Sequence, residues 1–257
     1  MKGSDSMLKV YKEEMLIRTS QCDCNGQWKP SAILECMQEA AGTHGELIGV
    51  GRNALLEKNV VWVLTRIEVV MDRYPSIGER ITVETFPMAV RRFFFPRYFI
   101  FKDEHDVEIG RAASLWALLD INTHRMASPA SLNLLFPDNS DLLAPLGLPA
   151  TVAEVSGTLE CSNFMPVYTD LDVNGHVNNT KYMDWCCNAL GIDAMREMCF
   201  ARFAINYDME LLPGQEVHAE LRRLANDFSY CGFSNGTRHF DVGGVLTERR
   251  QTVQTFR

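Results

Sequence analysis

The sequence has no run of apolar residues long enough to cross a bilayer, which takes about 20 of them in a helix. Its first residues show neither the apolar core of a secretory signal nor the arginine-rich character of a transit segment. Positive charge is also scarce: 25 basic residues face 33 acidic ones, for a formal charge of −8. We therefore expect a cytoplasmic protein that binds neither membranes nor nucleic acid, because a nucleic-acid surface usually carries a basic footprint.

Cysteines at metal-binding spacing are missing as well. The chain has eight cysteines, but the close pairs Cys22/Cys24 and Cys186/Cys187 lack the two intervening residues typical of a structural zinc site. In a protein that is not exported, these side chains are expected to be reduced thiols. The sequence therefore predicts neither a metal site nor a cofactor.

What is present is the composition of a folded globular protein, with 46% hydrophobic and 23% charged residues among 257. Apolar positions from Pro30 onward follow a 3.6-residue period, and Gly49 and Gly51 suit the exit of the helix that this period predicts. Runs rich in β-branched and aromatic residues follow and predict antiparallel strands at 60–70, 80–86, 92–102 and 108–120.

The second half repeats this order after a proline-containing acidic linker at 137–149. A strand near 151–159, a polar stretch and a helix carrying Tyr182 and Trp185 come first. Further strands are predicted at 200–211, 216–224, 227–233 and 245–256. An Asn-Gly pair before each helix, 149 residues apart, and turn glycines at Gly78 and Gly214, 136 residues apart, suggest a duplication, although the two offsets differ.

The element order predicts an α+β protein of two units, 1–140 and 150–257. Each unit is expected to be a curved antiparallel sheet that wraps a central helix, because short strands cover such a helix only by curving around it. Two such units side by side could form one continuous sheet. The chain would then carry both halves of a pair, so that it is expected to be a monomer or, alternatively, a homodimer of whole chains.

The densest cluster of polar side chains lies directly before the second predicted helix. If this stretch is extended, its two-residue period places Asp172, Asn174 and His176 on one side. A carboxylate, an amide and an imidazole would then meet beside the free N–H groups of a helix start, which suits an oxyanion. This constellation predicts hydrolysis or acyl transfer without a serine or cysteine nucleophile.

Two plainer interpretations of the same stretch stay open. Asp, Asn and Gly are the residues that any tight turn uses, and an asparagine is a ready helix cap. The order of Asp170, Asp172 and Asn174 also fits the start of a calcium loop. Lys181, however, stands where such a loop requires a glutamate, and a cation there opposes a metal ion.

The run Asp-Leu-Asp-Val-Asn-Gly-His-Val-Asn-Asn, followed by Tyr182 and Trp185, resembles the active-site segment of the acyl-acyl carrier protein (acyl-ACP) thioesterases of plant plastids and bacteria. Residues 63–78 and 111–120 resemble the N-terminal half of that family. The resemblance implies a bacterial member with a tandem double hot-dog fold, an acyl-binding unit at 1–140 and a catalytic unit at 150–257. It also implies hydrolysis of fatty acyl-ACP in fatty acid biosynthesis.

Carried over residue by residue, the resemblance implies that Asp172, Asn174 and His176 are catalytic. The family also uses a glutamate 34 residues after this histidine, and Glu210 stands at that position. Plant members often have a cysteine next to this glutamate, where the present chain has Leu211. Glu210 and His176 would then activate a water, Asn174 would stabilise the oxyanion, and Asp172 would either orient these groups or attack the carbonyl itself.

The resemblance places an apolar tunnel for the acyl chain in the N-terminal unit, where Met37, Trp62 and Leu64 are candidates for its lining. An acidic carrier protein requires a local basic surface on this acidic chain. The candidate arginines form three groups: Arg91, Arg92 and Arg97; Arg222 and Arg223; and Arg249 and Arg250. His44, on the apolar face of the first helix, is expected to be a packed residue and no catalyst.

Other functions fit the same pattern. A hot-dog thioesterase that acts on acyl-CoA would share the fold and the chemistry, and matched acyl-CoA and acyl-ACP substrates would distinguish the two. A non-catalytic acyl-binding protein would keep the fold and bind without turnover. A hot-dog dehydratase is less compatible with the polar cluster.

Overall fold

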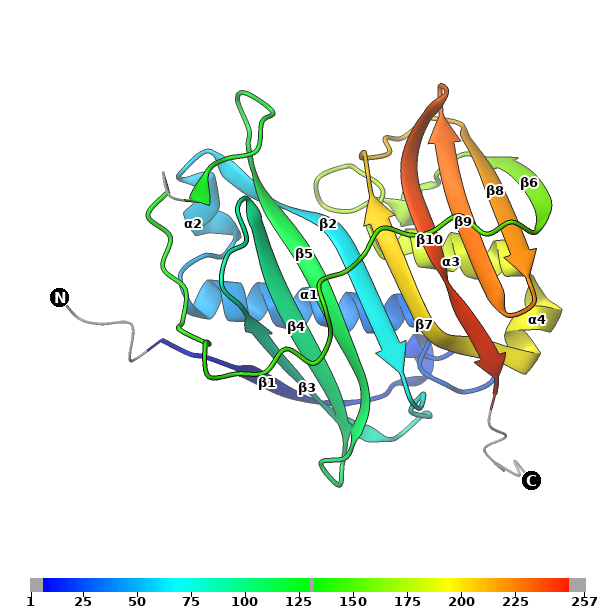
Figure 1. Ribbon diagram of the computed structural model, residues 1–257, viewed down its shortest axis with the longest axis horizontal. Coiled ribbons are helices and arrows are strands. Elements are labelled where there is room, and N and C mark those ends of the chain that lie inside the picture. The colour runs from blue at the N-terminus through cyan, green and yellow to red at the C-terminus, as the bar shows by residue number, and fades with distance from the viewer. Residues whose placement is uncertain (1–6, 130–131, 250–257) are drawn as a thin grey trace.

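The computed structural model describes residues 7–129 and 132–249 of the chain (Figure 1). The strands of the first half are β1 (Tyr11–Leu16), β2 (Val60–Met71), β3 (Arg80–Pro87), β4 (Phe94–Asp103) and β5 (Glu108–Asp120). Those of the second half are β6 (Thr158–Phe164), β7 (Met198–Tyr207), β8 (Val217–Leu224), β9 (Asp227–Ser234) and β10 (Thr237–Glu248). The helices are α1 (Pro30–Leu47), α2 (Arg52–Leu56), α3 (Lys181–Leu190) and α4 (Ile192–Glu197), and two 3-10 turns are η2 (Thr19–Gln21) and η4 (Tyr168–Asp170).

The ten strands of the described residues belong to one antiparallel sheet with the order β1-β3-β4-β5-β2-β7-β10-β9-β8-β6. The two halves join where β2 pairs with β7, around the partners Glu68 and Ala204. The two predicted sheets therefore form one continuous sheet, as expected if the two units lie side by side. Among the described residues, no helix has the length and apolar character needed to span a membrane.

The central helices α1 and α3 lie against the same face of this sheet (Figure 1). α1 buries Ile33 and Met37, and α3 buries Met183 and Trp185, so that the apolar stripe of each helix faces the strands. These side chains and the apolar residues of both halves of the sheet form one continuous core cluster. The sheet and its helices therefore share a single core across the join.

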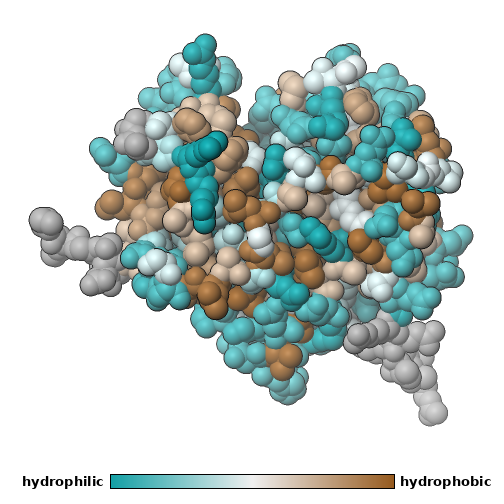
Figure 2. All heavy atoms as spheres, in the orientation of Figure 1, coloured by the Kyte–Doolittle hydropathy of each residue, from teal (hydrophilic) through white to brown (hydrophobic). Residues whose placement is uncertain are grey.

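The connection between β5 and β6 crosses the opposite face of the sheet (Figure 1). Leu142 and Leu146 of this connection pack against Phe86, Tyr98 and Ala113. Figure 2 shows apolar residues gathered over the middle of this face and polar residues along its upper and lower margins. The predicted linker is thus folded onto the sheet as a cover for apolar side chains.

The strand predicted near 151–159 is wrong. Residues 151–157 contain no strand; β6 begins at Thr158, and the preceding Val155 donates its N–H to the Ser229 hydroxyl at 3.1 Å. The strand predicted at 245–256 begins much earlier, at Thr237, because Asn235-Gly236 forms a tight hairpin turn with both residues at positive φ. It ends at Glu248, and residues 250–256 lie outside the described residues.

Candidate active site

The polar stretch before α3 is a tight turn over residues 171–177, and the predicted extended conformation is wrong. Leu171 and Val177 form an antiparallel bridge at its base, and the Asp172 N–H donates to the His176 carbonyl at 2.8 Å. Gly175 has a φ of +79°, a left-handed conformation that glycine adopts without steric cost. The turn interpretation of this sequence is therefore correct.

Asp172 holds the 171–177 turn together. Its Oδ1 accepts hydrogen bonds from the N–H groups of Asn174, at 2.8 Å, and His176, at 3.2 Å. Its Oδ2 accepts another from the Asn174 side-chain amide at 3.2 Å. The carboxylate is thus engaged within the turn. In the parts of the chain that the structure describes, no group of three or more His, Cys, Asp or Glu side chains is placed to hold a metal ion.

The turn brings His176 next to Glu210. The distance between His176 Nδ1 and Glu210 Oε2 is 3.4 Å, which allows an ion pair when the imidazole is protonated. The side chains are 36% and 62% exposed, so that a substrate and water can reach both. A carboxylate and an imidazole in this arrangement can hold a water and take its proton.

Glu210 lies beyond the end of β7, in the segment that faces the 171–177 turn. The carbonyl of the next residue, Leu211, accepts the N–H of Val177 at 2.9 Å and ties this segment to the turn. His239 Nδ1 lies 2.9 Å from the Glu210 carbonyl, which only accepts, so that the imidazole donates. His239 thereby fixes the Glu210 backbone. Sequence reasoning missed this contribution, because a lone histidine within a strand belongs to no recognisable pattern.

Two tyrosines pack against each other next to the start of α3. Tyr182 on α3 is 3% exposed, and burial, with smaller contributions from the charges of Asp172 and Glu210, raises the pKa of its phenol. The Tyr207 hydroxyl donates to the Asn179 carbonyl at 3.0 Å, and burial raises its pKa too. Both phenols therefore stay neutral.

A pocket of about 310 Å³ opens in the N-terminal half of the molecule and reaches the turn. Its apolar lining comes from α2, β2, β4, β5 and their connections and includes Val50, Leu55, Trp62, Phe95, Trp116 and Phe136. Asn174 of the 171–177 turn belongs to the same lining. An apolar chain in this pocket would therefore lead to the residues beside His176 and Glu210.

The three predicted lining residues occupy two neighbouring spaces. Trp62 lines the 310 Å³ pocket, and its indole N–H donates to the Val50 carbonyl at 2.9 Å. Met37 and Leu64 line a smaller space of about 10 Å³, which shares Gln38 with the pocket. Met37 is buried in the core, so the structure places only Trp62, among these three, against the larger pocket.

A buried arginine forms one part of the pocket wall. Arg97 donates from Nη1 to His44 Nδ1 at 3.0 Å and to the Thr85 hydroxyl at 3.2 Å. His44 Nε2 in turn donates to the Leu8 carbonyl at 2.9 Å. His44 is therefore neutral, and burial, assisted by the Arg97 charge, lowers its pKa to about 4. His44 is a packed residue, as predicted.

Two of the arginines expected on a basic surface are buried. Arg97 contacts His44 inside the molecule, and the Arg249 side chain is only 9% exposed and pairs with Asp23 at 2.6 Å. A guanidinium enclosed by the protein cannot meet a partner's charge. The prediction that these two side chains belong to a docking surface is therefore wrong.

The remaining arginine candidates differ in how free their charge is. Arg222 is paired with glutamates on its own half of the molecule, and Arg223 beside it is half-buried. Arg91 and Arg92 are exposed on the turn between β3 and β4, next to residues that line the pocket. Arg250 lies outside the described residues.

The chain matches two family models in succession. Residues 8–130 match the acyl-ACP thioesterase N-terminal domain and residues 154–239 match the acyl-ACP thioesterase C-terminal domain. The chain is 27% identical over 215 residues to the chloroplastic palmitoyl-acyl carrier protein thioesterase of Gossypium hirsutum, which covers 78% of this chain and 52% of that protein. The chain thus spans about half the length of the curated relatives it matches.

Solved structures share the fold over nearly the whole chain. An acyl-ACP thioesterase from Bacteroides thetaiotaomicron superimposes with a TM-score of 0.84 at 24% identity, covering 95% of this chain and 100% of that one. The 12:0-ACP thioesterase from Umbellularia californica superimposes with a TM-score of 0.78 at 20% identity, covering 97% and 99%. At these identities the likeness establishes a common fold.

Proposed function

Since this chain belongs to the acyl-ACP thioesterase family, we propose that it hydrolyses the thioester between a fatty acyl chain and acyl carrier protein. The observation that carries the proposal is the pairing of His176 with Glu210 at 3.4 Å beside an apolar pocket that Asn174 also lines. In the same proposal the fold is a double hot-dog, with an acyl-binding unit at 1–140 and a catalytic unit at 150–257. The single sheet with one central helix in each half supports that description.

In the proposed reaction, His176 and Glu210 take a proton from a water whose oxygen bonds to the thioester carbonyl carbon. The carbon–sulfur bond then breaks, and the carrier thiolate recovers the proton. The Asn174 side-chain amide stabilises the oxyanion. The turn's N–H groups at Asn174, His176 and Val177 donate within the protein, whereas the Asn174 side-chain amide uses one of its two N–H donors on Asp172 and keeps the other for the oxyanion.

Asp172 is assigned the role of orienting the turn. Its two oxygens already accept three hydrogen bonds from Asn174 and His176, which makes the carboxylate a poor nucleophile. Single turnover in water labelled with oxygen-18 tests this assignment. Label in the fatty acid alone is expected, whereas label in the Asp172 carboxylate would show that Asp172 attacks the carbonyl.

The proposed substrate places its acyl chain in the 310 Å³ pocket against Trp62. The carrier protein is proposed to dock at the turn that carries Arg91 and Arg92, because these exposed charges stand beside the pocket lining on an otherwise acidic chain. The cytoplasmic location, the bacterial origin and the monomeric or homodimeric state stay predictions.

The proposal is tested with matched acyl-ACP and acyl-CoA substrates and with the variants His176→Gln and Glu210→Gln. Each variant should lower kcat by about 10²-fold or more, because each removes half of the pair that activates water. Thermal melting should match that of the unchanged protein, since both side chains are solvent-exposed. A near-normal kcat in a folded variant contradicts the role given to that residue.

The substrate panel also separates the alternatives. Higher kcat/KM on acyl-ACP than on acyl-CoA is the expected result, and the reverse preference identifies an acyl-CoA thioesterase. Acyl chains that bind without turnover of any thioester identify a non-catalytic binding protein.

A further inference from the structure

The turn before α1, residues 22–28, has the same construction as the 171–177 turn. Asp23 Oδ1 accepts the N–H groups of Asn25 at 2.9 Å and Gln27 at 3.1 Å, the two backbone hydrogen bonds that the other turn's aspartate also accepts. The Asp23 N–H donates to the Gln27 carbonyl at 2.8 Å, and Gly26 has a φ of +72°. Each turn follows a 3-10 turn, η2 or η4.

The segments that face the two turns correspond as well. The Trp28 N–H donates to the Pro75 carbonyl at 2.9 Å, and the Val177 N–H donates to the Leu211 carbonyl at the same distance. Each turn is therefore fastened to the equivalent point of its own half. The two facing carbonyls are 136 residues apart in the sequence.

The same offset describes the join between the halves. Glu68 and Ala204 are 136 residues apart and are direct partners in the β2–β7 pairing. Gly78 and Gly214, at the same offset, have φ values of +85° and +82°. An approximate two-fold axis therefore passes through the join and relates the 22–28 turn to the 171–177 turn.

The pair of residues assigned to the chemistry is replaced in the first copy. By the correspondence of the turns, Gln27 stands in the place of His176. By the offset of the facing segments, Tyr74 stands in the place of Glu210. Burial raises the pKa of Tyr74, and its hydroxyl donates to the Phe200 carbonyl at 3.0 Å. Neither a glutamine nor a neutral tyrosine can take the proton of a water at neutral pH.

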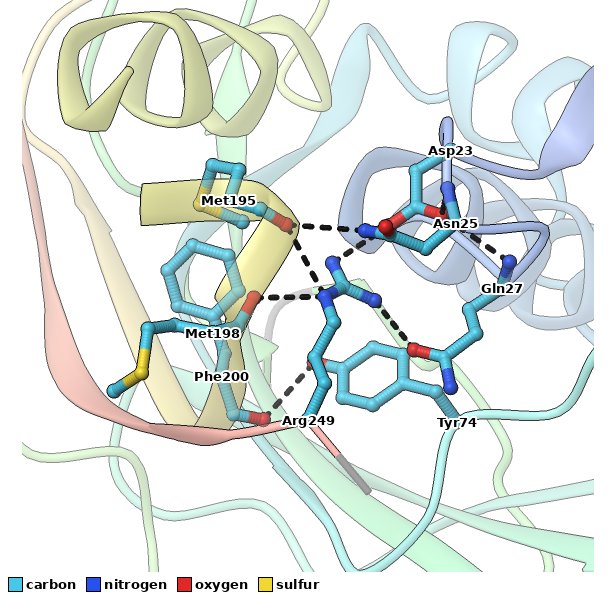
Figure 3. Close-up of polar contacts among 8 residues, drawn as sticks. All are labelled: Asp23, Asn25, Gln27, Tyr74, Met195, Met198, Phe200 and Arg249. Carbon is cyan, nitrogen blue, oxygen red and sulfur yellow. Dashed lines mark hydrogen bonds and ion pairs between the residues drawn. The ribbon is translucent and has the colours of Figure 1, made fainter. Parts of the chain in front are cut away.

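Arg249, the residue that follows β10, lies against the 22–28 turn (Figure 3). Its guanidinium pairs with Asp23 at 2.6 Å and donates to the Gln27 side-chain carbonyl. Its Nε lies 3.1 Å from the carbonyl of Met195, within α4, and 2.8 Å from the carbonyl of Met198, the first residue of β7. One buried side chain thus links elements from both halves of the chain.

We propose that the 22–28 turn is a second, inactive copy of the active-site turn that has become a socket, and that Arg249 is a positioning residue that fixes the C-terminal unit on the N-terminal unit through it. The inference rests on the proposed function. The proposal assigns one active site to each chain. The place that the two-fold axis relates to this site is occupied by the Arg249 side chain.

The position of this contact explains why it would matter for the reaction. Among the described residues, the two halves are joined by the β2–β7 strand pairing and by the apolar core that they share. The Arg249 contact adds a charged attachment between the 22–28 turn and the backbone of α4 and β7. Because apolar packing is non-directional, a hydrogen-bonded ion pair of fixed geometry resists small shifts between the halves that the packing alone permits.

The predicted consequence depends on the length of the acyl chain. A long chain lies in the pocket of the N-terminal half while its carbonyl meets His176 and Glu210 of the C-terminal half. A shift between the halves therefore moves the carbonyl away from the pair. An acetyl thioester is too short to occupy the pocket, so its hydrolysis depends on the pair alone.

The test compares Arg249→Met with Arg249→Lys in the full chain, using palmitoyl and acetyl thioesters of the same carrier. In Arg249→Met, kcat/KM for the palmitoyl substrate should fall by about 10- to 100-fold, as expected for an ångström-scale misplacement, while the acetyl substrate is unaffected. Arg249→Lys should recover part of the loss. Equal losses on both substrates would overturn the proposal, because a purely structural role lowers them together.

Asp23→Asn keeps the proposal testable if Arg249→Met fails to fold. An asparagine retains the Oδ1 acceptor that holds the turn and removes only the charge that pairs with Arg249. The same selective loss on the long chain is expected, and an unchanged palmitoyl rate would contradict the inference. If the unchanged protein hydrolyses neither thioester, the proposed function itself fails, a result distinct from the failure of the socket.

The single active site has its own test. His176→Gln should leave no turnover beyond that of the double variant with Gln27→Ala, because neither Gln27 nor Tyr74, the counterparts of His176 and Glu210, can take the proton of a water. Residual turnover in His176→Gln that Gln27→Ala removes would show that the first turn is an active site.

Discussion

Asp172 and Asp23 accept the same two backbone hydrogen bonds in two turns, of which only one faces a histidine and a glutamate. The aspartate is therefore required by the turn itself, whether or not chemistry takes place there. This explains how one residue type fits both the turn interpretation and the catalytic interpretation of the sequence. His176 and Glu210, in contrast, have no role in the hydrogen bonding of the turn through their side chains, which leaves the chemistry as their explanation.

His44 makes stability depend on pH in a predictable direction. Its pKa is lowered to about 4 in the folded protein, while the pKa of a histidine in the unfolded chain is about 6.5. The unfolded state therefore binds the proton first as pH falls. The free energy of unfolding should decrease between about pH 6.5 and about pH 4, by up to about 1.4 kcal/mol per pH unit from this one proton.

Urea denaturation of the unchanged protein and of His44→Gln across this pH range measures the effect. Carboxylates that titrate at the lower end contribute to both proteins, so the difference between the two slopes isolates His44. A slope that is the same in both proteins would contradict a neutral, buried His44 beside Arg97.

At the scale of elements, α1 offers a position from which the pocket can be changed. Gly42 belongs to the pocket lining, and a Cβ added there would meet no atom within 4 Å. Gly42→Ala should raise the free energy of unfolding by about 0.5–1 kcal/mol, because alanine favours a helix more than glycine does. It should leave the preference for acyl chain length unchanged.

Gly42→Leu extends a branched side chain into the same pocket. Its kcat/KM should fall for long acyl chains and stay constant for short ones, as measured with a series of acyl-ACP substrates against Gly42→Ala as control. A uniform loss along the series would show that the acyl chain does not occupy this pocket.

The elements that sequence patterns predicted are those with a long, regular pattern. α1, α3 and the strands β2 to β5 begin and end within a few residues of the predicted bounds. β1 was missed because it is a largely exposed edge strand. Its sequence, Tyr-Lys-Glu-Glu-Met-Leu, does not alternate between apolar and polar residues. α2 and α4 have five and six residues, too few for a helical period to appear.

The site was predictable to a different extent for each residue. Asp172, Asn174 and His176 stand at alternate positions of one short, recognisable run. Glu210 follows from the family spacing alone, because its position depends on how the chain leaves β7 and on the hydrogen bond from His239. No local pattern reports a contact between residues so far apart in the sequence.

At the scale of the whole molecule, the exposed turn with Arg91 and Arg92 should control the encounter with an acidic carrier protein. Replacing both by glutamate should raise KM for acyl-ACP several-fold, on the order expected for two rim charges, and leave kcat unchanged. The KM of the unchanged protein should rise with ionic strength, because salt screens exposed charges.

For a control with the same change in net charge, Arg91→Glu alone is compared with Arg196→Glu, since Arg196 is exposed on α4 at the opposite end of the molecule (Figure 1). The KM of Arg196→Glu and its salt dependence should equal those of the unchanged protein. A KM that responds equally to both changes would indicate an effect of net charge, and a flat response to salt would exclude electrostatic docking.

The covalent linkage of the two halves has an evolutionary consequence. In an assembly of two identical chains, every substitution appears twice, so an enlarged pocket and an intact reaction centre must be encoded by the same residues. Because β2 and β7 join two halves that are encoded separately, one half can gain space for a ligand while the other keeps its acid–base groups. The two halves of a tandem chain can therefore specialise for different tasks, whereas the identical subunits of a symmetric dimer cannot.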